Sequence, residues 1–401
     1  MFEQFNKYTA NLNIDAKNQF ITAELTFSYY CNINSTNELR FYIYKDLIVE
    51  NISSKNQITY VVEEEVSDWC PFVLESKLIK ISLDKPVKLG DRVDLSFEYK
   101  GHVNLVTKYG INRISDRWIE LGIYTPWFPV IETLENALFN LSIKIDDGYE
   151  VVNSNKVGDS FILNQLSPEM DSTIIASNEF YQIENKIHDI DMNVYVIEEA
   201  HKTLAEDISR YSNLILSKYA SFGRIDGSNI SIVIAPREDG GGYCRSNLIV
   251  LTPNDNLDDD IRYFKYIAHE LAHLWWCKAT FNSWEDWLNE SFAEYSALLV
   301  LRDIFGEDEF NQRIEKYKAK AEGLPPIMGI DRGEEKAYEV LYIKGPLLLY
   351  ELERTTGREK FIELLNIIHL GNIDTTEKFL AKLGNLTNGN IRDNFKKQLS
   401  L

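Results

Sequence analysis

The sequence is poor in cysteine and contains no long hydrophobic run. Its four cysteines, Cys31, Cys70, Cys244 and Cys277, form no C-x-x-C pair, so we expect neither a disulfide framework nor a dithiol redox motif. No apolar segment approaches the roughly 20 residues that a membrane helix requires. The N-terminal segment also lacks the basic stretch and apolar core of a signal peptide. These absences predict a cytoplasmic protein that does not bind a membrane.

Basic runs are absent as well. The chain has 42 Lys and Arg against 62 Asp and Glu, which gives a net charge of −20 at pH 7. Such a charge repels phosphate backbones and argues against nucleic-acid binding. It is typical of a solvated acidic surface, and a weaker interpretation is that its field attracts peptides with a cationic amine. A hydrophobic content of 44% over 401 residues is ordinary for a globular protein and leaves room for two or three domains.

The most informative motif is the H-E-x-x-H run at His269, Glu270 and His273. Apolar residues recur around it at helical spacing, and two residues four apart on a helix share one face. Both imidazoles could therefore bind one ion. Zinc with three protein ligands keeps a position for water, and a nearby carboxylate such as Glu270 can take the proton of that water. We predict one zinc ion per chain; the alternative is a chance match in a structural protein.

The third ligand is predicted downstream, in a second helical segment that begins near Trp284. Glu290 lies there beside two tryptophans, and a buried acid needs a partner, which a metal ion would provide.

Two segments, HELAHLWW (269–276) and WLNESFAEY (287–295), resemble the zinc aminopeptidase family that includes aminopeptidase N and leukotriene hydrolase, which are gluzincin metallopeptidases. The family patterns are HELAHQW and WLNEGFA. The resemblance implies that His269, His273 and Glu290 bind zinc and that Glu270 is the general base. Sixteen residues separate His273 from Glu290, which is shorter by two than the usual family spacing. Glu294 is the rival third ligand, and otherwise it accepts a hydrogen bond that orients a ligand histidine.

The rest of the chain predicts an α+β multidomain protein. Polar and apolar residues alternate in segments such as 21–29, 93–99 and 139–145, which indicates an antiparallel all-β domain over residues 1–185. Helical spacing follows at 204–219, β segments at 229–235 and 247–252, and amphipathic helices to the C-terminus. Residues 186–401 are therefore predicted to form a thermolysin-like α/β catalytic domain with terminal helices. The large C-terminal helical domain of longer family members is not expected.

Substrate-binding residues are predicted in two places. Glu120 corresponds to a loop of the family's β domain that reaches the active site, although an ordinary strand-end acid is an alternative. The turn at Gly241, Gly242 and Tyr243 precedes a strand that could pair with an extended peptide. It corresponds to the family's G-A-M-E-N motif, whose glutamate binds the substrate amine, but here Cys244 takes that position. A neutral thiol followed by Arg245 removes one usual support for strict aminopeptidase action.

The final motif, Tyr342-Ile343-Lys344-Gly345, is similar to the family's Y-x-K-G motif. By this resemblance the Tyr342 hydroxyl donates to the oxyanion of the tetrahedral intermediate, with Tyr338 as the rival. We predict a zinc metallopeptidase that removes N-terminal residues from peptides. The alternatives are a thermolysin-like endopeptidase and a non-catalytic peptide-binding protein. The sequence does not define the oligomeric state.

Overall fold

The structure is a computed structural model that describes residues 4–104, 111–165, 167–187, 189–225, 229–237, 241–253 and 260–401, and only the backbone of Asp260. The chain divides into two compact units. The first comprises residues 1–181 and 236–241, and the second comprises residues 182–235 and 242–401. The short segment 236–241 thus belongs with the β unit although it lies in sequence within the second.

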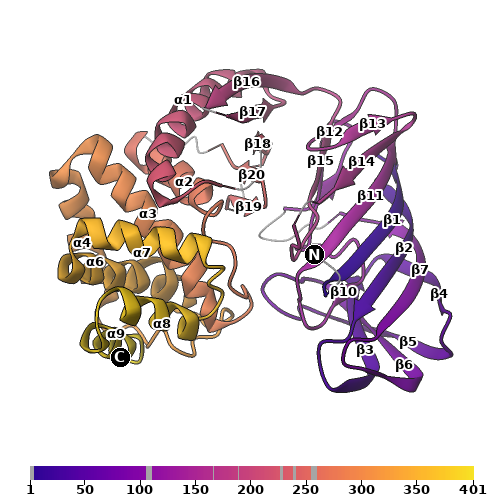
Figure 1. The fold of residues 1–401 in the computed structure, drawn as a ribbon. Helices are drawn as coiled ribbons and strands as arrows, with labels where there is room; N and C mark the ends of the chain where they lie inside the picture. The colour runs from indigo at the N-terminus through magenta and orange to yellow at the C-terminus, as the bar shows by residue number, and fades with distance from the viewer. Residues whose placement is uncertain are drawn as a thin grey trace. The chain divides into compact units, whose positions relative to one another are not determined.

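The first unit is built of β-strands. Its main sheet has seven strands in the order β13-β14-β11-β1-β2-β7-β4, and two four-stranded sheets have the orders β10-β3-β6-β5 and β12-β15-β9-β8 (Figure 1). The strands are β1 (Asn6–Asp15), β2 (Phe20–Tyr30), β3 (Ser35–Tyr44), β4 (Leu47–Ser54), β5 (Ile58–Ser67), β6 (Ser76–Lys88), β7 (Arg92–His102), β8 (Arg113–Ile114), β9 (Ile119–Leu121), β10 (Val130–Ile131), β11 (Ala137–Ile145), β12 (Glu150–Val151), β13 (Asn155–Val157), β14 (Ser160–Asn164) and β15 (Ile174–Ser177).

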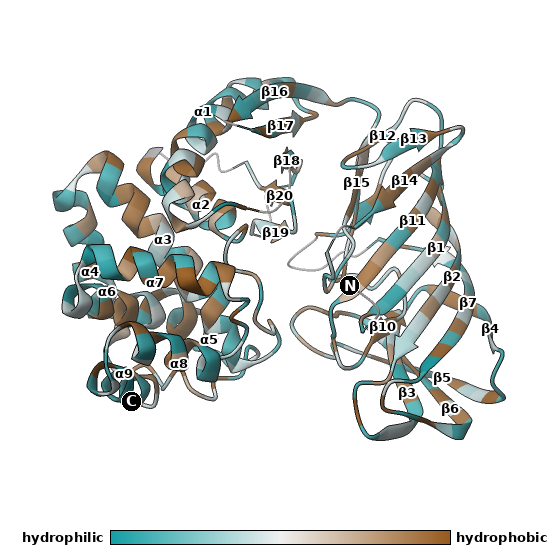
Figure 2. Ribbon diagram, viewed as in Figure 1, coloured by the Kyte–Doolittle hydropathy of each residue, from teal (hydrophilic) through white to brown (hydrophobic). Residues whose placement is uncertain are grey.

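The predicted alternation of polar and apolar residues explains why these segments form strands. In β1 and β7 every second side chain is buried, and hydrophilic and hydrophobic residues alternate along β1, β2, β7 and β11 (Figure 2). One prediction needs correction: the unit is not wholly antiparallel, because β1 pairs in parallel with β11. The two strands are far apart in sequence, so alternation within each could not reveal their relative direction.

The second unit combines a sheet with helices. The sheet has five strands in the order β16-β17-β18-β20-β19, and its helices share one hydrophobic core with it. The strands are β16 (Tyr181–Ile187), β17 (Ile190–Val196), β18 (Asn229–Ile234), β19 (Tyr243–Arg245) and β20 (Leu248–Leu251). The main helices are α1 (Lys202–Tyr219), α2 (Asp260–Ala272), α3 (Trp287–Phe305), α4 (Glu307–Ala321), α6 (Gly345–Thr356), α7 (Arg358–Leu370), α8 (Thr376–Leu386) and α9 (Gly389–Leu399).

Short helical turns complete the unit: η1 (Glu199–His201), η2 (Ala220–Phe222), η3 (Trp284–Asp286), α5 (Ala337–Glu339) and the π-helical turn η4 (Val340–Lys344). The predicted fold class, a β domain followed by a mixed α/β region with terminal helices, is confirmed. Within the described part of the chain no helix is both long and apolar enough to span a membrane.

Helix α3 is the centre of this unit. It is buried on nearly all sides, including Trp287 and Tyr295, and it packs against α2, α4 and α6. Gly345 at the start of α6 makes the closest approach: a Cβ there would lie 1.9 Å from Oγ of Ser291 and 2.6 Å from its Cβ. Ser291 Oγ also donates to the Leu341 carbonyl at 2.7 Å. The glycine of the Y-x-K-G motif therefore holds η4 tightly against α3.

Replacing this glycine should cost stability. We expect Gly345→Ala to lower the free energy of unfolding by about 2–3 kcal/mol, because an extra methyl group in a packed helix contact forces the backbones apart. Gly389 is a matched control, since it also begins a helix and an added Cβ would have Arg392 Nη2 at 3.8 Å as its nearest neighbour. Urea unfolding of both variants tests this; equal stability of Gly345→Ala and the unchanged protein would contradict the close contact.

Candidate metal centre and active site

Three predicted ligands lie together in the second unit. His269 is on the last turn of α2, His273 follows the end of α2 directly, and Glu290 is in the first turn of α3. Nε2 of His269 lies 3.4 Å from Glu290 Oε2, and Nε2 of His273 lies 3.6 Å from the same oxygen. One ligand atom from each residue falls within 4.8 Å of the others. Tetrahedral zinc ligands at ordinary bond lengths stand about 3.3 Å apart, so the spacing fits one ion.

The other nitrogen of each imidazole is held from outside the cluster. Nδ1 of His269 lies 2.9 Å from Glu294 Oε2, and Nδ1 of His273 lies 2.9 Å from the Trp276 carbonyl oxygen. Since both partners are acceptors, each Nδ1 carries the proton and donates. The lone pair of each Nε2 is then directed at the shared point beside Glu290, which is the arrangement of histidines that bind metals.

The electrostatics of the cluster favour a cation. Glu290 Oε2 is buried and has no hydrogen-bond partner within the described residues, although buried carboxylate oxygens normally have one. Burial lowers the pKa of His269, but the neighbouring carboxylates of Glu290 and Glu294 outweigh it and raise the pKa to about 10. Burial also lowers the pKa of His273, but the neighbouring Glu290 outweighs it, and the pKa is raised. Positive charge is therefore stabilised between these side chains, and a divalent cation fits the donor set.

Glu294, one turn after Glu290 on α3, contacts Nδ1 of His269 through its Oε2. Its Oε1 receives hydrogen bonds from Lys265 Nζ and the Tyr317 hydroxyl. Burial raises the pKa of Glu294, but the nearby Lys265 and His269 outweigh this and hold it well below its usual range. Both oxygens are thus occupied by donors of the protein, which favours the orienting role over that of the rival third ligand.

Removing the charge of Glu294 should weaken the metal site without abolishing it. We expect Glu294→Gln to reduce zinc affinity about 10- to 100-fold, because the amide holds the His269 ring less firmly and makes it a poorer ligand. Competition with a chromogenic chelator measures the affinity. Loss of all stoichiometric zinc in this variant would instead make Glu294 a direct ligand.

Glu270 lies beside the cluster on α2, with its carboxylate buried. Burial raises its pKa, which the neighbouring His269 and His273 partly oppose. A carboxylate with a raised pKa is better suited to accept and return a proton near neutral pH. A Cβ on Gly242 would lie 3.0 Å from Cδ of Glu270 and 2.4 Å from the Tyr266 hydroxyl, so the absence of a side chain lets the backbone approach the carboxylate.

Gly242 leads into β19, which is an edge strand of the five-stranded sheet and pairs antiparallel with β20. Tyr243 is buried, and the Arg245 guanidinium lies 5.1 Å from its ring centroid. Cys244 Sγ lies 3.4 Å from the Ser246 carbonyl oxygen. The sequence predicted the following strand but not β19 itself, because three residues beside glycines show no clear alternation. An edge strand next to Glu270 is a site where an extended peptide can pair.

Tyr342 lies on the π-helical turn η4, a distortion that is frequent at functional sites. Its ring stacks on His269 with centroids 5.4 Å apart, and the Tyr338 ring stacks on the Tyr342 ring with centroids 4.4 Å apart. Burial and the neighbouring Glu290 raise the pKa of Tyr342 well above its usual value, so the hydroxyl keeps its proton. The structure thus places a neutral donor beside the ligand cluster.

Arg332 is a member of the site that sequence reasoning missed. Its Nε lies 3.2 Å from Asp286 Oδ2 and its Nη2 lies 3.9 Å from Glu290 Oε1, and it interacts with the Tyr342 hydroxyl. Burial and Glu290 raise the pKa of Asp286 to about 7, while Arg332 opposes this rise. Arg332 occupies a loop without periodicity, so no sequence signal could have placed it.

The lysine of the Y-x-K-G motif has a structural role. Lys344 Nζ donates to the carbonyl oxygens of Leu324 and Pro325, at 3.1 and 2.8 Å. It therefore fastens the loop after α4 to the turn that carries Tyr342.

Two other predicted substrate residues belong to the first unit. Glu120 is fully buried, and Arg237 binds it through two nitrogens, Nη2 to Oε1 at 3.1 Å and Nε to Oε2 at 3.2 Å. Trp118 Nε1 donates to the same carboxylate at 3.3 Å. Arg237 also donates to the Gly241 carbonyl oxygen at 3.4 Å. The roles of Glu120 and Gly241 towards a substrate stay predictions, and the charge of Glu120 is already balanced by Arg237.

Comparison with known proteins shows what this chain is similar to. Residues 239–397 match the peptidase family M1 domain. A probable aminopeptidase 2 from Sulfurisphaera tokodaii is 24% identical over 193 residues, which covers 43% of this chain and 25% of that protein. Aminopeptidase 2, mitochondrial, from Saccharomyces cerevisiae is 25% identical over 252 residues, which covers 55% of this chain and 26% of that protein. The aligned part thus spans about a quarter of the length of these curated relatives.

Solved structures show the same fold over nearly the whole chain. One similar structure is a variant of an M1 zinc metallopeptidase from Deinococcus radiodurans bound to a Tyr-Ser-Ala substrate. The superposition has a TM-score of 0.72 at 14% sequence identity, and it covers 99% of this chain and 94% of that chain. Native leukotriene A4 hydrolase from Saccharomyces cerevisiae superposes with a TM-score of 0.73 at 17% sequence identity. This superposition covers 97% of this chain and 66% of that chain. Residues 239–397 thus match an M1 peptidase domain, and the resemblance to the zinc aminopeptidase family that the sequence indicated is confirmed.

Proposed function

We propose that this protein is a zinc-dependent aminopeptidase that removes N-terminal residues from peptides. The observation that carries the proposal is the convergence of His269, His273 and Glu290 on one point, with Glu270 beside it. The named aminopeptidases among its relatives support the reaction class. The Tyr-Ser-Ala peptide bound to the structural neighbour supports a peptide as the substrate.

Each residue then has a defined task. His269, His273 and Glu290 would hold the zinc ion, which supplies a Lewis acid for the scissile carbonyl and makes a water molecule more acidic. Glu270 takes the proton from the attacking water and delivers it to the leaving amine, so that it acts first as base and then as acid. Tyr342 donates a hydrogen bond from its hydroxyl to the carbonyl oxygen as negative charge develops there, which stabilises the transition state more than the substrate.

The edge strand β19 supplies the position of the peptide. It is the last strand of the five-stranded sheet, and Gly242 directly before it brings the backbone close to Glu270. An extended peptide bound there as an added strand would present its scissile bond beside the cluster.

A second candidate function is endopeptidase action, and one observation favours it. The position that binds the substrate amine in the family pattern is Cys244, whose thiol carries no full charge, and Arg245 follows it. Arg245 lies near enough to lower the pKa of Glu270, so a positive charge stands close to the reacting atoms. Such a charge repels a terminal ammonium group.

A peptide series offered with a free and with an acetylated N-terminus separates the two functions. An aminopeptidase cleaves only the free form, one residue at a time from the N-terminus. Cleavage of both forms at the same internal bond would replace the proposal with endopeptidase action, and cleavage of neither by zinc-loaded protein would leave a peptide-binding role.

A further inference from the structure

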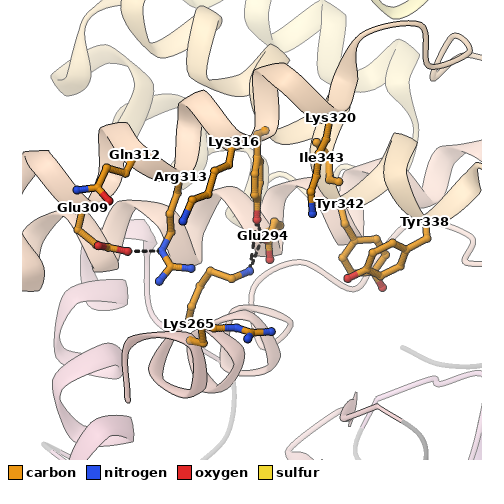
Figure 3. A pocket seen from close by; sticks show the side chains of 12 residues that line it. Lys265, Glu294, Glu309, Gln312, Arg313, Lys316, Lys320, Tyr338, Tyr342 and Ile343 are labelled. Atoms are coloured by element: carbon orange, nitrogen blue, oxygen red, sulfur yellow. Dashed lines mark hydrogen bonds and ion pairs between the residues drawn. The ribbon is translucent and has the colours of Figure 1, made fainter. Parts of the chain in front are cut away.

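A basic pocket adjoins the candidate active site in the second unit. It has a volume of about 670 Å³ and lies between α2, α4 and the turn that carries the two stacked tyrosines (Figure 3). Tyr342, which stacks on His269, forms part of its wall, as does Glu294. Whatever fills the pocket therefore lies next to a side chain of the reaction site.

The pocket is positive although the protein is strongly negative. Five of its lining residues are cationic and two are anionic: Arg262, Lys265, Arg313, Lys316 and Lys320 against Glu294 and Glu309. Both acids are already paired, Glu294 with Lys265 and Glu309 with Arg313. Local excess of positive charge on a chain of net charge −20 is a departure from the rest of the surface.

Three of these cations have no ion-pair partner within the described residues: Arg262, Lys316 and Lys320. Lys316 and Lys320 are four residues apart on α4, so their charges lie one turn apart on the same face. Like charges at this spacing destabilise a helix, and a bound anion relieves their repulsion. A solvated helix face would instead alternate its charges, as the neighbouring pair Lys318 and Glu315 does.

Tyr338 provides an apolar surface beside these charges. It is 64% exposed, unusually high for a large aromatic side chain, and its ring stacks on Tyr342. Figure 3 shows Tyr338 and Tyr342 together, with the lysines of α4 on the adjoining wall. An aromatic face next to unpaired cations suits a peptide segment that carries a carboxylate, because the ring packs against its apolar part.

We propose that this pocket binds a carboxylate of the peptide substrate, so that the enzyme prefers peptides with an acidic side chain or a free C-terminal carboxylate close to the scissile bond. Lys316, Lys320 and Arg262 pair with the carboxylate while Tyr338 packs against the adjacent chain. The identification of the ligand as a substrate rests on the proposed peptidase function.

Binding to a zinc-loaded Glu270→Gln protein tests the pocket separately from turnover. Two peptide pairs identify the source of the carboxylate: one pair differs only in a C-terminal carboxylate or amide, and the other, with the C-terminus amidated, differs only in Glu or Gln at the second or third residue. Isothermal titration should show about tenfold tighter binding of the charged member of at least one pair.

Removing the unpaired lysines should remove this preference. In the Lys316→Gln/Lys320→Gln variant of the same protein, the ratio of the two affinities should fall to about twofold or less. The control is Lys360→Gln/Lys382→Gln, which changes the net charge equally at exposed lysines of α7 and α8 that do not line the pocket. It should keep the tenfold ratio.

The outcomes separate the two proposals. Equal binding of charged and neutral peptides would contradict the proposal that the pocket binds a carboxylate. An equal loss of preference in the control variant would contradict it as well. The binding preference can also depend on Lys316 and Lys320 while the protein with Glu270 intact hydrolyses no peptide. That result would support carboxylate binding in the pocket and contradict the proposed peptidase function.

Discussion

Glu270→Gln should reduce kcat/KM for peptide hydrolysis about 10³-fold or more while the protein keeps one zinc ion. General acid–base catalysis contributes about 10²- to 10⁴-fold, and in the proposed mechanism one carboxylate serves in both proton transfers. The amide has the same shape, so the close approach of Gly242 to this side chain is retained. The measurement combines steady-state kinetics with metal analysis of the same preparation.

Metal content is the control that gives this result its meaning. Because Glu270 is not among the converging ligand atoms, zinc stoichiometry should be unchanged in Glu270→Gln. Activity within tenfold of the unchanged protein would remove Glu270 from the proton transfers. Loss of zinc along with activity would show instead that the carboxylate supports the metal.

Tyr342→Phe should reduce kcat about 10²- to 10³-fold with a small change in KM. This is the cost of removing one oxyanion donor, whose interaction develops only in the transition state. The ring itself remains, so stacking on His269 and Tyr338 is preserved. Kinetics with a neutral, amidated peptide avoid any contribution from the basic pocket.

Tyr338→Phe is the matched comparison, since it removes the hydroxyl of the neighbouring stacked ring. Its effect on kcat should be at least tenfold smaller, because Tyr342 and not Tyr338 stacks on His269. A larger loss in Tyr338→Phe than in Tyr342→Phe would transfer the donor role to Tyr338.

Sequence alone predicted the parts of the site that depend on local spacing. A helical H-E-x-x-H run brings His269 and His273 to one face, and the WLNE segment brings Glu290 to the first turn of the next helix, so their meeting requires only that two helices pack together. The catalytic role of each residue remains a prediction that the variants above test.

The sequence could not predict the parts that depend on long-range packing. Arg332 reaches Glu290 from an irregular loop, and Lys265 and Tyr317 converge on Glu294 from two helices. The pairing of Glu120 with Arg237 joins residues far apart in the chain, and alternation within strands says nothing of it. The basic pocket likewise combines side chains of α2, α3, α4 and the Tyr338 and Tyr342 turns, which lie apart in the sequence.

The spacing between His273 and Glu290 shows both what the sequence could predict and what it could not. It is shorter by two residues than the family pattern; from the sequence Glu290 was predicted as the third ligand, with Glu294 as its rival. In the structure the Nε2 atoms of both histidines lie within 3.6 Å of Glu290, whereas Glu294 faces Nδ1 of His269. The short connection therefore still permits Glu290 to reach the cluster.

Zinc titration of the metal-free protein tests the central claim most directly. Hydrolysis of a free-amine peptide is followed as zinc is added in fractions of an equivalent per chain. We expect activity to rise linearly and to saturate at one zinc ion per chain. Hydrolysis that is complete without zinc, or absent in protein that holds one equivalent, would contradict a zinc peptidase built on His269, His273 and Glu290.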